Sequence, residues 1–268
     1  MSKHVFIYSN KRQRSLDLAQ SLREELEARG VAVDEAPGAG TDAILCIGGD
    51  GAFLHLIHDF DLPENPVLGI NTGHVGFFQD MKPGQILEQV LDFLYNRSES
   101  GIRILSTLQS EIWTPDGLQI IRGLNEMVVK GRDGVNVHLN ISIGESFIER
   151  FSGDGILVSS TAGSTAYNYS LGGSLVDPRL DILQVTPIAP MNNRTYRCFT
   201  SSLLLPPDQS LEVIPDNPED SYIHLMTDGF VYEFSAVDRI RITYGEKKLK
   251  SVTLAGYDFW RKVKEKFL

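Results

Sequence analysis

The sequence has little cysteine and lacks any long apolar run. Its 268 residues include two cysteines, Cys46 and Cys198, which argues against the disulfide framework that small secreted proteins use. No apolar stretch approaches the roughly 20 residues of a membrane-spanning helix, and the first residues carry no signal-peptide pattern. We therefore expect a cytoplasmic protein without a membrane partner.

Positive charge is also scarce. The chain has 25 lysines and arginines against 35 aspartates and glutamates, which gives a formal net charge of −10 at pH 7. Nucleic acids and anionic membranes bind to extended basic surfaces, so we expect neither as a partner. An acidic protein still binds phosphate groups when backbone amides, helix N-termini or metal ions hold them.

Two nucleotide-binding fingerprints are absent as well. A P-loop needs a lysine and then a serine or threonine after its glycines, whereas Ala52 and Phe53 follow the glycine-rich residues 48–51. A dinucleotide-binding Gly-x-Gly-x-x-Gly sequence is missing too. These absences disfavour a Walker-type ATPase and an NAD-dependent dehydrogenase.

The sequence does contain two regions with different periodicity. In the first, short apolar runs alternate with amphipathic segments, which predicts an α/β domain with a parallel sheet. From about residue 100, strict alternation, as in residues 135–143, predicts mostly antiparallel β structure. In the first region we expect strands at 5–8, 43–47 and 67–70 and helices at 15–29, 52–59 and 85–95. In the second we expect strands at 106–113, 118–122, 135–143, 147–151, 156–159, 201–205, 211–214, 231–235, 239–244 and 249–254.

The segment Gly48-Gly49-Asp50-Gly51 connects an expected strand to an expected helix. Glycines let a ligand approach the backbone closely, and a helix N-terminus offers free amides and a partial positive charge. Phosphates would repel the carboxylate of Asp50 unless it binds Mg²⁺ or accepts a proton from a hydroxyl group. The sequence favours a phosphate site here, although a tight turn with an N-capping aspartate explains the same residues.

Four further segments carry polar groups or glycines. Residues 71–78 follow the third expected strand and include His74, a residue type that is more often structural than ligand-binding. Leu124-Asn125-Glu126 offers an amide beside a carboxylate, and Thr227-Asp228-Gly229 offers an acid beside a glycine. Residues 152–174 combine Asp154 with many small hydroxyl residues and glycines, which leaves room for a bulky ligand. Taken singly, the shorter segments are typical of polar loops and β-turns.

Taken in order, these segments resemble the NAD kinases, in particular those of Gram-positive bacteria. The resemblance extends from Gly48 to Gly229 and includes Gly-Gly-Asp-Gly, Asn-x-Gly-x-x-Gly-Phe, Asn-Glu, Ser-Gly-Asp-Gly, Gly-Ser-Thr-Ala-Tyr, Thr-Pro-Ile and Asp-Gly. It implies an α/β domain at residues 1–98, a β-sandwich-like NAD-binding domain at 99–252, and a segment at 253–268 that returns to the first domain. It also implies a homodimer or homotetramer that uses Mg²⁺ to transfer a phosphoryl group from ATP or polyphosphate to the 2′-hydroxyl of the adenosine ribose of NAD.

The resemblance also implies roles for individual residues. Asp50 matches the catalytic base of the family, Asn125 and Glu126 match residues that bind the adenosine part of NAD, and Asp154 matches a residue that recognises the nicotinamide amide. Asp228 is expected near a ribose. The phosphate donor is expected at Gly48, Gly49 and Gly51, and the remaining residues expected to contact NAD are Gly49, Gly51, Asn71, Phe78, Ser164, Thr165, Ala166, Tyr167 and Ser170.

Three residues depart from the family pattern. Ala52 and Ala162 stand where the family commonly has threonines, and Thr161 stands in place of a proline. The lost hydroxyls and the lost stiffness predict a weaker site for the same ligands.

Two other functions use some of the same residues. A lipid kinase would share the first glycine loop, but it should also show a membrane-binding surface, and the sequence has no basic amphipathic helix. A non-catalytic NAD sensor would keep Asn125, Glu126 and Asp154 without needing Asp50. A purely structural two-domain protein leaves the glycine-acid segments unexplained.

Overall fold

The computed structural model describes residues 2–73, 76–81, 84–96, 100–195 and 197–268. The chain divides into two compact units: unit 1 comprises residues 1–105 and 247–268, and unit 2 comprises residues 106–246. Two long strands, β5 (Ser100–Thr114) and β16 (Arg239–Leu254), contribute residues to both units. The functional domain boundaries expected at 98/99 and 252/253 stay a prediction.

Unit 1 contains a parallel sheet whose strands follow the order β2-β1-β3-β4, with the end of β16 paired to β4. In chain order the elements are β1 (His4–Ser9), α1 (Gln13–Ala28), β2 (Ala32–Asp34), β3 (Ala43–Gly48), α2 (Asp50–Asp59), β4 (Val67–Asn71), α3 (Ile86–Tyr95) and α5 (Phe259–Phe267). The expected α/β architecture of this part is confirmed.

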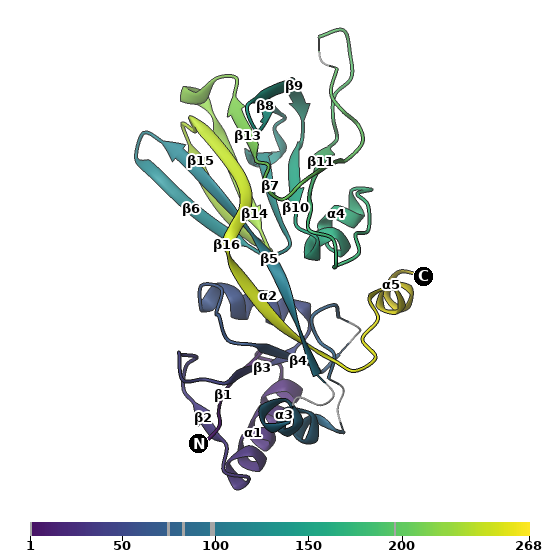
Figure 1. The fold of residues 1–268 in the computed structure, drawn as a ribbon. Coiled ribbons are helices and arrows are strands. Elements are labelled where there is room, and N and C mark those ends of the chain that lie inside the picture. The colour runs from purple at the N-terminus through teal and green to yellow at the C-terminus, as the bar shows by residue number, and fades with distance from the viewer. Residues whose placement is uncertain (1, 74–75, 82–83, 97–99, 196) are drawn as a thin grey trace. The chain divides into compact units, whose positions relative to one another are not determined.

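The alternation of side chains along β3 explains how helices cover both faces of this sheet. Ala43, Leu45 and Ile47 belong to an apolar cluster with residues of α1 and α3. Ile44 and Cys46 point to the opposite face, and Figure 1 shows α2 on that side. Because all six residues of β3 are buried, its sequence is a continuous apolar run, as is typical of a parallel strand.

Unit 2 consists of two antiparallel sheets. One has the order β12-β11-β10-β7-β14-β15, and the other contains β9, β8, β13 and the first part of β16, together with β5 and β6. The strands are β6 (Gly117–Gly123), β7 (Glu126–Gly131), β8 (Val137–Ile143), β9 (Ser146–Gly153), β10 (Gly155–Ser159), β11 (Leu183–Ile188), β12 (Leu203–Leu205), β13 (Leu211–Pro215), β14 (Tyr222–Thr227) and β15 (Phe230–Ser235), with the short helix α4 (Tyr167–Ser170). The expected antiparallel β class is confirmed.

The core of unit 2 lies between inward-facing residues of both sheets, including Val129, Ile156, Leu139 and Phe151. Leu157 alternates to the other face of β10 and packs in a smaller apolar cluster, against which Leu171 lies after α4. The glycine-rich segment around residues 160–174 is thereby anchored on the outer face of this sheet.

The strand predictions were incomplete in the six-stranded sheet and wrong in one further place. Strands β7, β11 and β14 were not anticipated, although all three lie inside the six-stranded sheet. Their polar residues, such as Gln184, Thr186 and His224, interrupt the apolar pattern. The two strands expected at 239–244 and 249–254 form one continuous strand, β16. None of the helices in the described residues is long and apolar enough to cross a membrane.

Gly69 in β4 allows a close backbone approach that shapes the site described below. The amides of Asp80 and Met81 donate to the carbonyl oxygen of Gly69, over 3.2 and 3.1 Å. A Cβ atom at Gly69 would lie 2.0 Å from the carbonyl oxygen of Phe78 and 2.8 Å from the Cα of Gln79. Residues 78–81 therefore pack directly on β4, and only glycine leaves space for them.

We predict that Gly69→Ala destabilises the protein, because the added methyl group meets backbone atoms that cannot move independently. Overpacking of this kind costs about 1–3 kcal/mol of unfolding free energy. Chemical denaturation of the variant measures this loss. The matched control is Gly40→Ala, since no heavy atom lies within 4 Å of the Cβ position there. Equal stability of the two variants would contradict the close approach.

Candidate functional site

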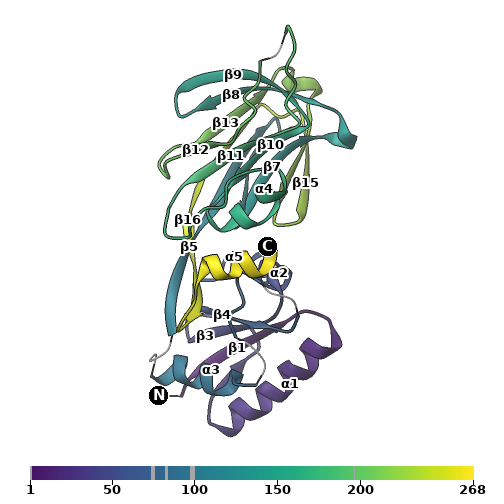
Figure 2. The same ribbon diagram turned by 90° about the vertical axis from the view of Figure 1, so that its right-hand side faces the viewer.

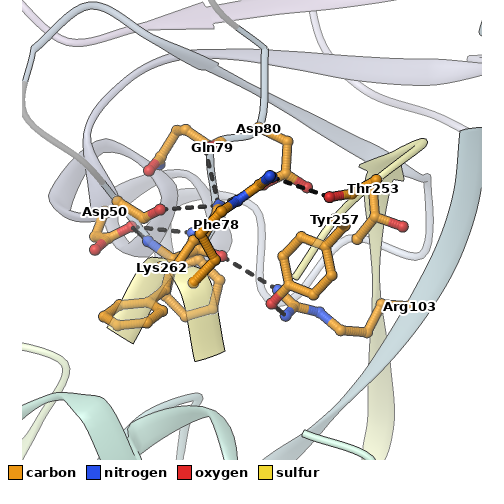
Figure 3. Close-up of polar contacts among 12 residues, drawn as sticks. Asp50, Phe78, Gln79, Asp80, Arg103, Thr253, Tyr257 and Lys262 are labelled. Carbon is orange, nitrogen blue, oxygen red and sulfur yellow. Dashed lines mark hydrogen bonds and ion pairs between the residues drawn. The ribbon is translucent and has the colours of Figure 1, made fainter. Parts of the chain in front are cut away.

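Asp50 connects the carboxyl ends of two neighbouring parallel strands. Strand β3 ends at Gly48, and Asp50 is the first residue of α2. One carboxylate oxygen, Oδ1, accepts hydrogen bonds from the amides of Phe77 and Phe78, at 2.8 and 3.1 Å (Figure 3). Phe77 and Phe78 lie in the segment after β4, so the acid holds together the two segments that the sequence predicts at one edge of the sheet.

The three glycines around Asp50 have different roles. A Cβ atom at Gly48 would lie 2.5 Å from the Cβ of Ala52, so this glycine permits the close packing of α2 on β3. No heavy atom lies within 4 Å of the Cβ positions of Gly49 and Gly51. The helix itself offers no acceptor for its first amides, so the open side of Gly49 and Gly51 is suited to anion binding.

The C-terminal helix α5 brings two lysines to the same region. Lys262 donates to the carbonyl oxygens of Gly76 and Gln79, at 2.9 and 3.1 Å, and pairs with Asp80. Lys266 pairs with the Oδ2 atom of Asp50 at 3.0 Å. Neither lysine was anticipated from the sequence, because nothing in a basic C-terminal stretch indicates which partner it contacts.

Arg103 was also missed by the sequence analysis. Its guanidinium group donates to the carbonyl oxygen of Phe77 at 3.3 Å and to the hydroxyl of Tyr257, and it lies 5.0 Å from the centre of the Tyr257 ring. Figure 3 shows these side chains close to Lys262 and Phe78. Arg103, Tyr257 and Lys262 thus fix the backbone whose amides hold Asp50.

In unit 2, Asp228 organises the Asn-Glu segment. Its two carboxylate oxygens accept the amides of Leu124 and Asn125, at 2.7 and 2.8 Å, and the residue is 7% exposed. Asp228 adopts φ = 50° in the turn between β14 and β15. The structure therefore brings Asp228, Asn125 and Glu126 together, and the carboxylate of Asp228 contacts backbone amides.

Several buried polar atoms beside this turn have no hydrogen-bond partner among the described residues: Asn125 Oδ1, Glu126 Oε2 and Thr227 Oγ1. Burial raises the pKa of Glu126 to about 8, and the nearby charge of Asp228 adds to that effect. A buried polar atom without a partner is costly, and ligand groups satisfy such atoms at binding sites. These three residues are suited to bind hydroxyl and amino groups.

The segment that follows β10 packs closely on Asn125. The Ser160 amide donates to the Asn125 carbonyl oxygen at 2.9 Å, and the Ser160 hydroxyl donates to the Leu124 carbonyl oxygen at 2.6 Å. A Cβ atom at Gly163 would lie 1.9 Å from that Asn125 oxygen. Ser164 is fully buried, and its hydroxyl accepts the amide of Val176 at 3.1 Å. The backbone of this segment is therefore fixed against the Asn-Glu pair.

The other residues expected in this segment differ in exposure. Thr165 is buried, and its hydroxyl lies 3.4 Å from the carbonyl oxygen of Ala162. Ala166 is half-buried, whereas Tyr167 and Ser170 are exposed on α4. The side chains of Tyr167 and Ser170 are accessible to a ligand, whereas the buried hydroxyl of Ser164 contacts the backbone of Val176.

Asp154 lies away from this group. It immediately precedes β10, whereas Ser159 at the far end of that strand pairs with Glu126. Five residues of extended strand at about 3.3 Å each place Asp154 roughly 16 Å from Glu126 along the strand direction. The structure thus does not gather Asp154 with Asn125 and Glu126.

Phe78 and Asn71, which are expected to contact NAD, form contacts within unit 1. The ring of Phe78 is 5% exposed and stacks on Phe53, with ring centroids 4.6 Å apart. Asn71 accepts the amide of Gly73 at 2.7 Å. His74 lies outside the described residues. Within those residues no group of three or more His, Cys, Asp or Glu side chains forms a metal site.

Thr161 partly restores what the missing proline would supply. Its φ of −58° is one that proline would also adopt, and its hydroxyl donates to the carbonyl oxygen of Leu180 at 2.8 Å. This hydrogen bond joins the turn at Thr161 to the backbone of Leu180 and restricts its conformation. At Ala52, by contrast, the methyl group packs against Gly48.

Comparisons with known proteins agree over the length of the chain. The family model described as the ATP-NAD kinase N-terminal domain matches residues 5–98, and the one described as the ATP-NAD kinase C-terminal domain matches residues 124–254. An NAD kinase of Finegoldia magna is 35% identical and covers 100% of this chain and 98% of its own length. An NAD kinase of Streptococcus pneumoniae is 31% identical, over 99% of this chain and 96% of its own.

Two solved structures share the fold. The yeast NADH kinase complexed with NADH has a TM-score of 0.84 at 20% identity and matches 98% of this chain and 87% of its own. The NAD kinase from Archaeoglobus fulgidus in complex with ATP has a TM-score of 0.76 at 22% identity and matches 98% and 99% of the two chains.

The buried position of Glu126 predicts a pH-dependent stability. Its pKa is about 8 in the folded protein and 4.5 in an ordinary environment, so between these pH values the folded state holds the extra proton. This contribution to stability is fully present below pH 4.5 and is lost as the pH rises through 8. We therefore expect Glu126→Gln to gain stability relative to the wild type between pH 5 and pH 8.

The apparent midpoint of thermal unfolding, measured at several pH values, checks this prediction. The control is Glu145→Gln, because Glu145 is exposed in the turn between β8 and β9. Parallel pH profiles of the wild type and Glu126→Gln would show that Glu126 is not held in its neutral form.

Proposed function

This chain belongs to the NAD kinase family, and we propose that it transfers the terminal phosphoryl group of ATP to the 2′-hydroxyl of the adenosine ribose of NAD, which produces NADP. Polyphosphate is the alternative donor. The observation that supports the proposal most directly is the position of Asp50, an acid at the N-terminus of α2 between Gly49 and Gly51, whose Cβ positions have no heavy atom within 4 Å. A base next to a phosphate site is what phosphoryl transfer to a hydroxyl requires.

Unit 2 supplies the groups that we propose for NAD. Asn125 Oδ1, Glu126 Oε2 and Thr227 Oγ1 are buried and have no hydrogen-bond partner in the described part of the chain, and the adenine amino group and ribose hydroxyls of a dinucleotide would satisfy them. Asp228 holds the backbone of this segment in place. We propose the same ligand for the segment that packs on Asn125 and for Asp154, so that the other NAD-binding residues are Ser164, Thr165, Ala166, Tyr167 and Ser170.

The proposed reaction makes one phosphorus–oxygen bond, breaks another and moves one proton. The ribose 2′-oxygen attacks the terminal phosphorus of ATP, the bond from that phosphorus to the bridging oxygen of ADP breaks, and ADP leaves with the electron pair. The proton of the 2′-hydroxyl passes to Asp50. Its Oδ1 atom already accepts two amides, so we assign the proton to Oδ2, the oxygen that pairs with Lys266. These amides also hold the carboxylate in one orientation, which is a precondition for an efficient base.

The donor set fits a Mg²⁺ ion that the phosphates of ATP would hold. In the described part of the chain no cluster of three ligating side chains exists, and Mg²⁺ usually binds through one or two carboxylates, several waters and substrate phosphates. Asp50 is the carboxylate at this site. When bound, the ion would offset the negative charge of the transferring phosphoryl group.

The proposal also includes the cellular compartment and the oligomeric state. We propose that the protein acts in the cytoplasm as a homodimer or homotetramer. Light scattering coupled to gel filtration would determine the number of subunits.

We predict that purified protein forms NADP from NAD and Mg²⁺ with ATP, with polyphosphate, or with both. Asp50→Asn should lower kcat by about 10²–10⁴-fold, because general bases contribute that much. NAD binding should persist, since the amide oxygen still accepts the amides of Phe77 and Phe78. A coupled assay that consumes NADP measures the activity, and calorimetry measures the affinity for NAD.

The control is Asp17→Asn, which changes an exposed aspartate on α1 in the same unit. Near-normal turnover of Asp50→Asn would exclude Asp50 as the base. Binding of NAD without any NADP formation by the wild type would support a non-catalytic NAD sensor in place of the kinase.

A further inference from the structure

We propose that Lys266, near the end of α5, is a donor-binding residue that contacts the phosphoryl oxygens of the nucleotide while it pairs with Asp50. This inference rests on the proposed function and extends it to a segment that no motif of the sequence covers. Helix α5 follows β16 and closes the described chain, and it is drawn in yellow in Figure 2.

The ammonium group of Lys266 has unused hydrogen-bond donors at the site. It carries three N–H groups, and among the described residues its only hydrogen-bond acceptor is Asp50 Oδ2, at 3.0 Å. The Lys266 side chain is 31% exposed, so ligand oxygens can reach it. Lys266 therefore lies beside the proposed base with N–H groups that phosphoryl oxygens of the donor could accept.

Lys262 provides the contrast on the same helix. It lies four residues earlier and therefore on the same face, but its ammonium group contacts Gly76, Gln79 and Asp80. Its side chain is only 14% exposed. Lys262 thus has its donors occupied by protein and holds the backbone, whereas Lys266 keeps donors for a ligand.

The position of Lys266 is fixed by packing, which lowers the entropic cost of using it. Phe259 and Val263 of α5 are buried, and the rings of Phe259 and Phe267 each lie 5.9 Å from the ring of Phe77. The Lys266 ammonium lies 4.6 Å from the centre of that same Phe77 ring. The side chain is therefore held over Phe77, whose amide binds Asp50.

A buried side chain beside Asp50, that of Gln79, has polar atoms without a hydrogen-bond partner among the described residues. Gln79 is 3% exposed, and neither its Oε1 nor its Nε2 atom has a hydrogen-bond partner among the described residues. A Cβ atom at Gly76 would lie 2.2 Å from Gln79 Oε1 and 2.6 Å from Asp50 Oδ1, so both groups face the space over Gly76. An unsatisfied buried amide next to Asp50 independently indicates that a polar ligand binds there.

The charge balance of the site requires such a cation. The phosphates of ATP would approach the carboxylate of Asp50 in a chain of net charge −10. Lys266 is the lysine that offsets the charge of Asp50 directly, through the 3.0 Å pair. The remaining N–H groups of Lys266 would donate charge-assisted hydrogen bonds to the bound phosphates.

The test compares three variants in the NADP-forming assay. Lys266→Met removes the charge and keeps an unbranched side chain over Phe77, Lys266→Arg keeps the charge, and Lys264→Met changes an exposed lysine of the same helix as a control. We expect Lys266→Met to raise KM for ATP and to lower kcat/KM for ATP by about 10- to 100-fold, as loss of a charge-assisted hydrogen bond predicts. KM for NAD should stay unchanged, and Lys266→Arg should recover most of the loss.

Binding of a non-hydrolysable ATP analogue, measured by calorimetry, separates this inference from the proposed function. Weaker binding by Lys266→Met, with unchanged binding by Lys264→Met, supports the inference even if the wild type forms no NADP, an outcome that would refute only the proposed function. Unchanged binding by Lys266→Met, or no binding by the wild type, overturns it. A fall in kcat with KM for ATP unchanged also overturns it, because Lys266 would then only orient Asp50.

Discussion

One carboxylate oxygen of Asp50 accepts the amides of Phe77 and Phe78, and the candidate site in unit 1 depends on this pair of hydrogen bonds. It fixes the start of α2 to the segment that follows β4. Residues that hold that segment from the other side, such as Arg103 and Lys262, therefore act on Asp50 through the backbone. The orientation of the proposed base therefore depends on these backbone contacts as well as on its pair with Lys266.

A carboxylate that accepts two consecutive backbone amides also occurs in unit 2. Asp228 accepts the amides of two consecutive residues, Leu124 and Asn125, just as Asp50 does at Phe77 and Phe78. In both cases an acid next to a glycine holds a loop from another element in a single conformation. The difference lies in burial: Asp228 is 7% exposed and raises the pKa of Glu126, whereas the side chain of Asp50 is 25% exposed and pairs with a lysine. Asp228 thus holds a buried segment, whereas the carboxylate of Asp50 remains partly accessible to solvent.

Local sequence patterns predicted the features that depend on interactions between residues close in sequence. The apolar run at 43–47 and the glycines after it were sufficient to place Asp50 at a sheet edge, because parallel strands end at the same side. The central strands β7, β11 and β14 could not be predicted, since hydrogen bonds from neighbours on both sides compensate for their polar residues.

Long-range contacts account for the rest of what the sequence did not reveal. Lys266 reaches Asp50 across 216 residues, and no periodicity encodes that pairing. The separation of Asp154 from Glu126 also depends on which end of β10 meets β7, which the spacing of motifs does not specify. The ordered motifs therefore led to the family, while the contacts of single residues required the structure.

The division of unit 1 into two sequence segments has a consequence for synthesis on the ribosome. Strand β4 pairs with β16 through Val67 and Ser251, and Asp50 pairs with Lys266, so the sheet edge and the proposed base acquire their last partners late. At about 5–20 residues per second, the 216 residues between Asp50 and Lys266 take about 10–40 s to translate. During that interval the nascent chain exposes the edge of β4, where a chaperone or another strand can bind.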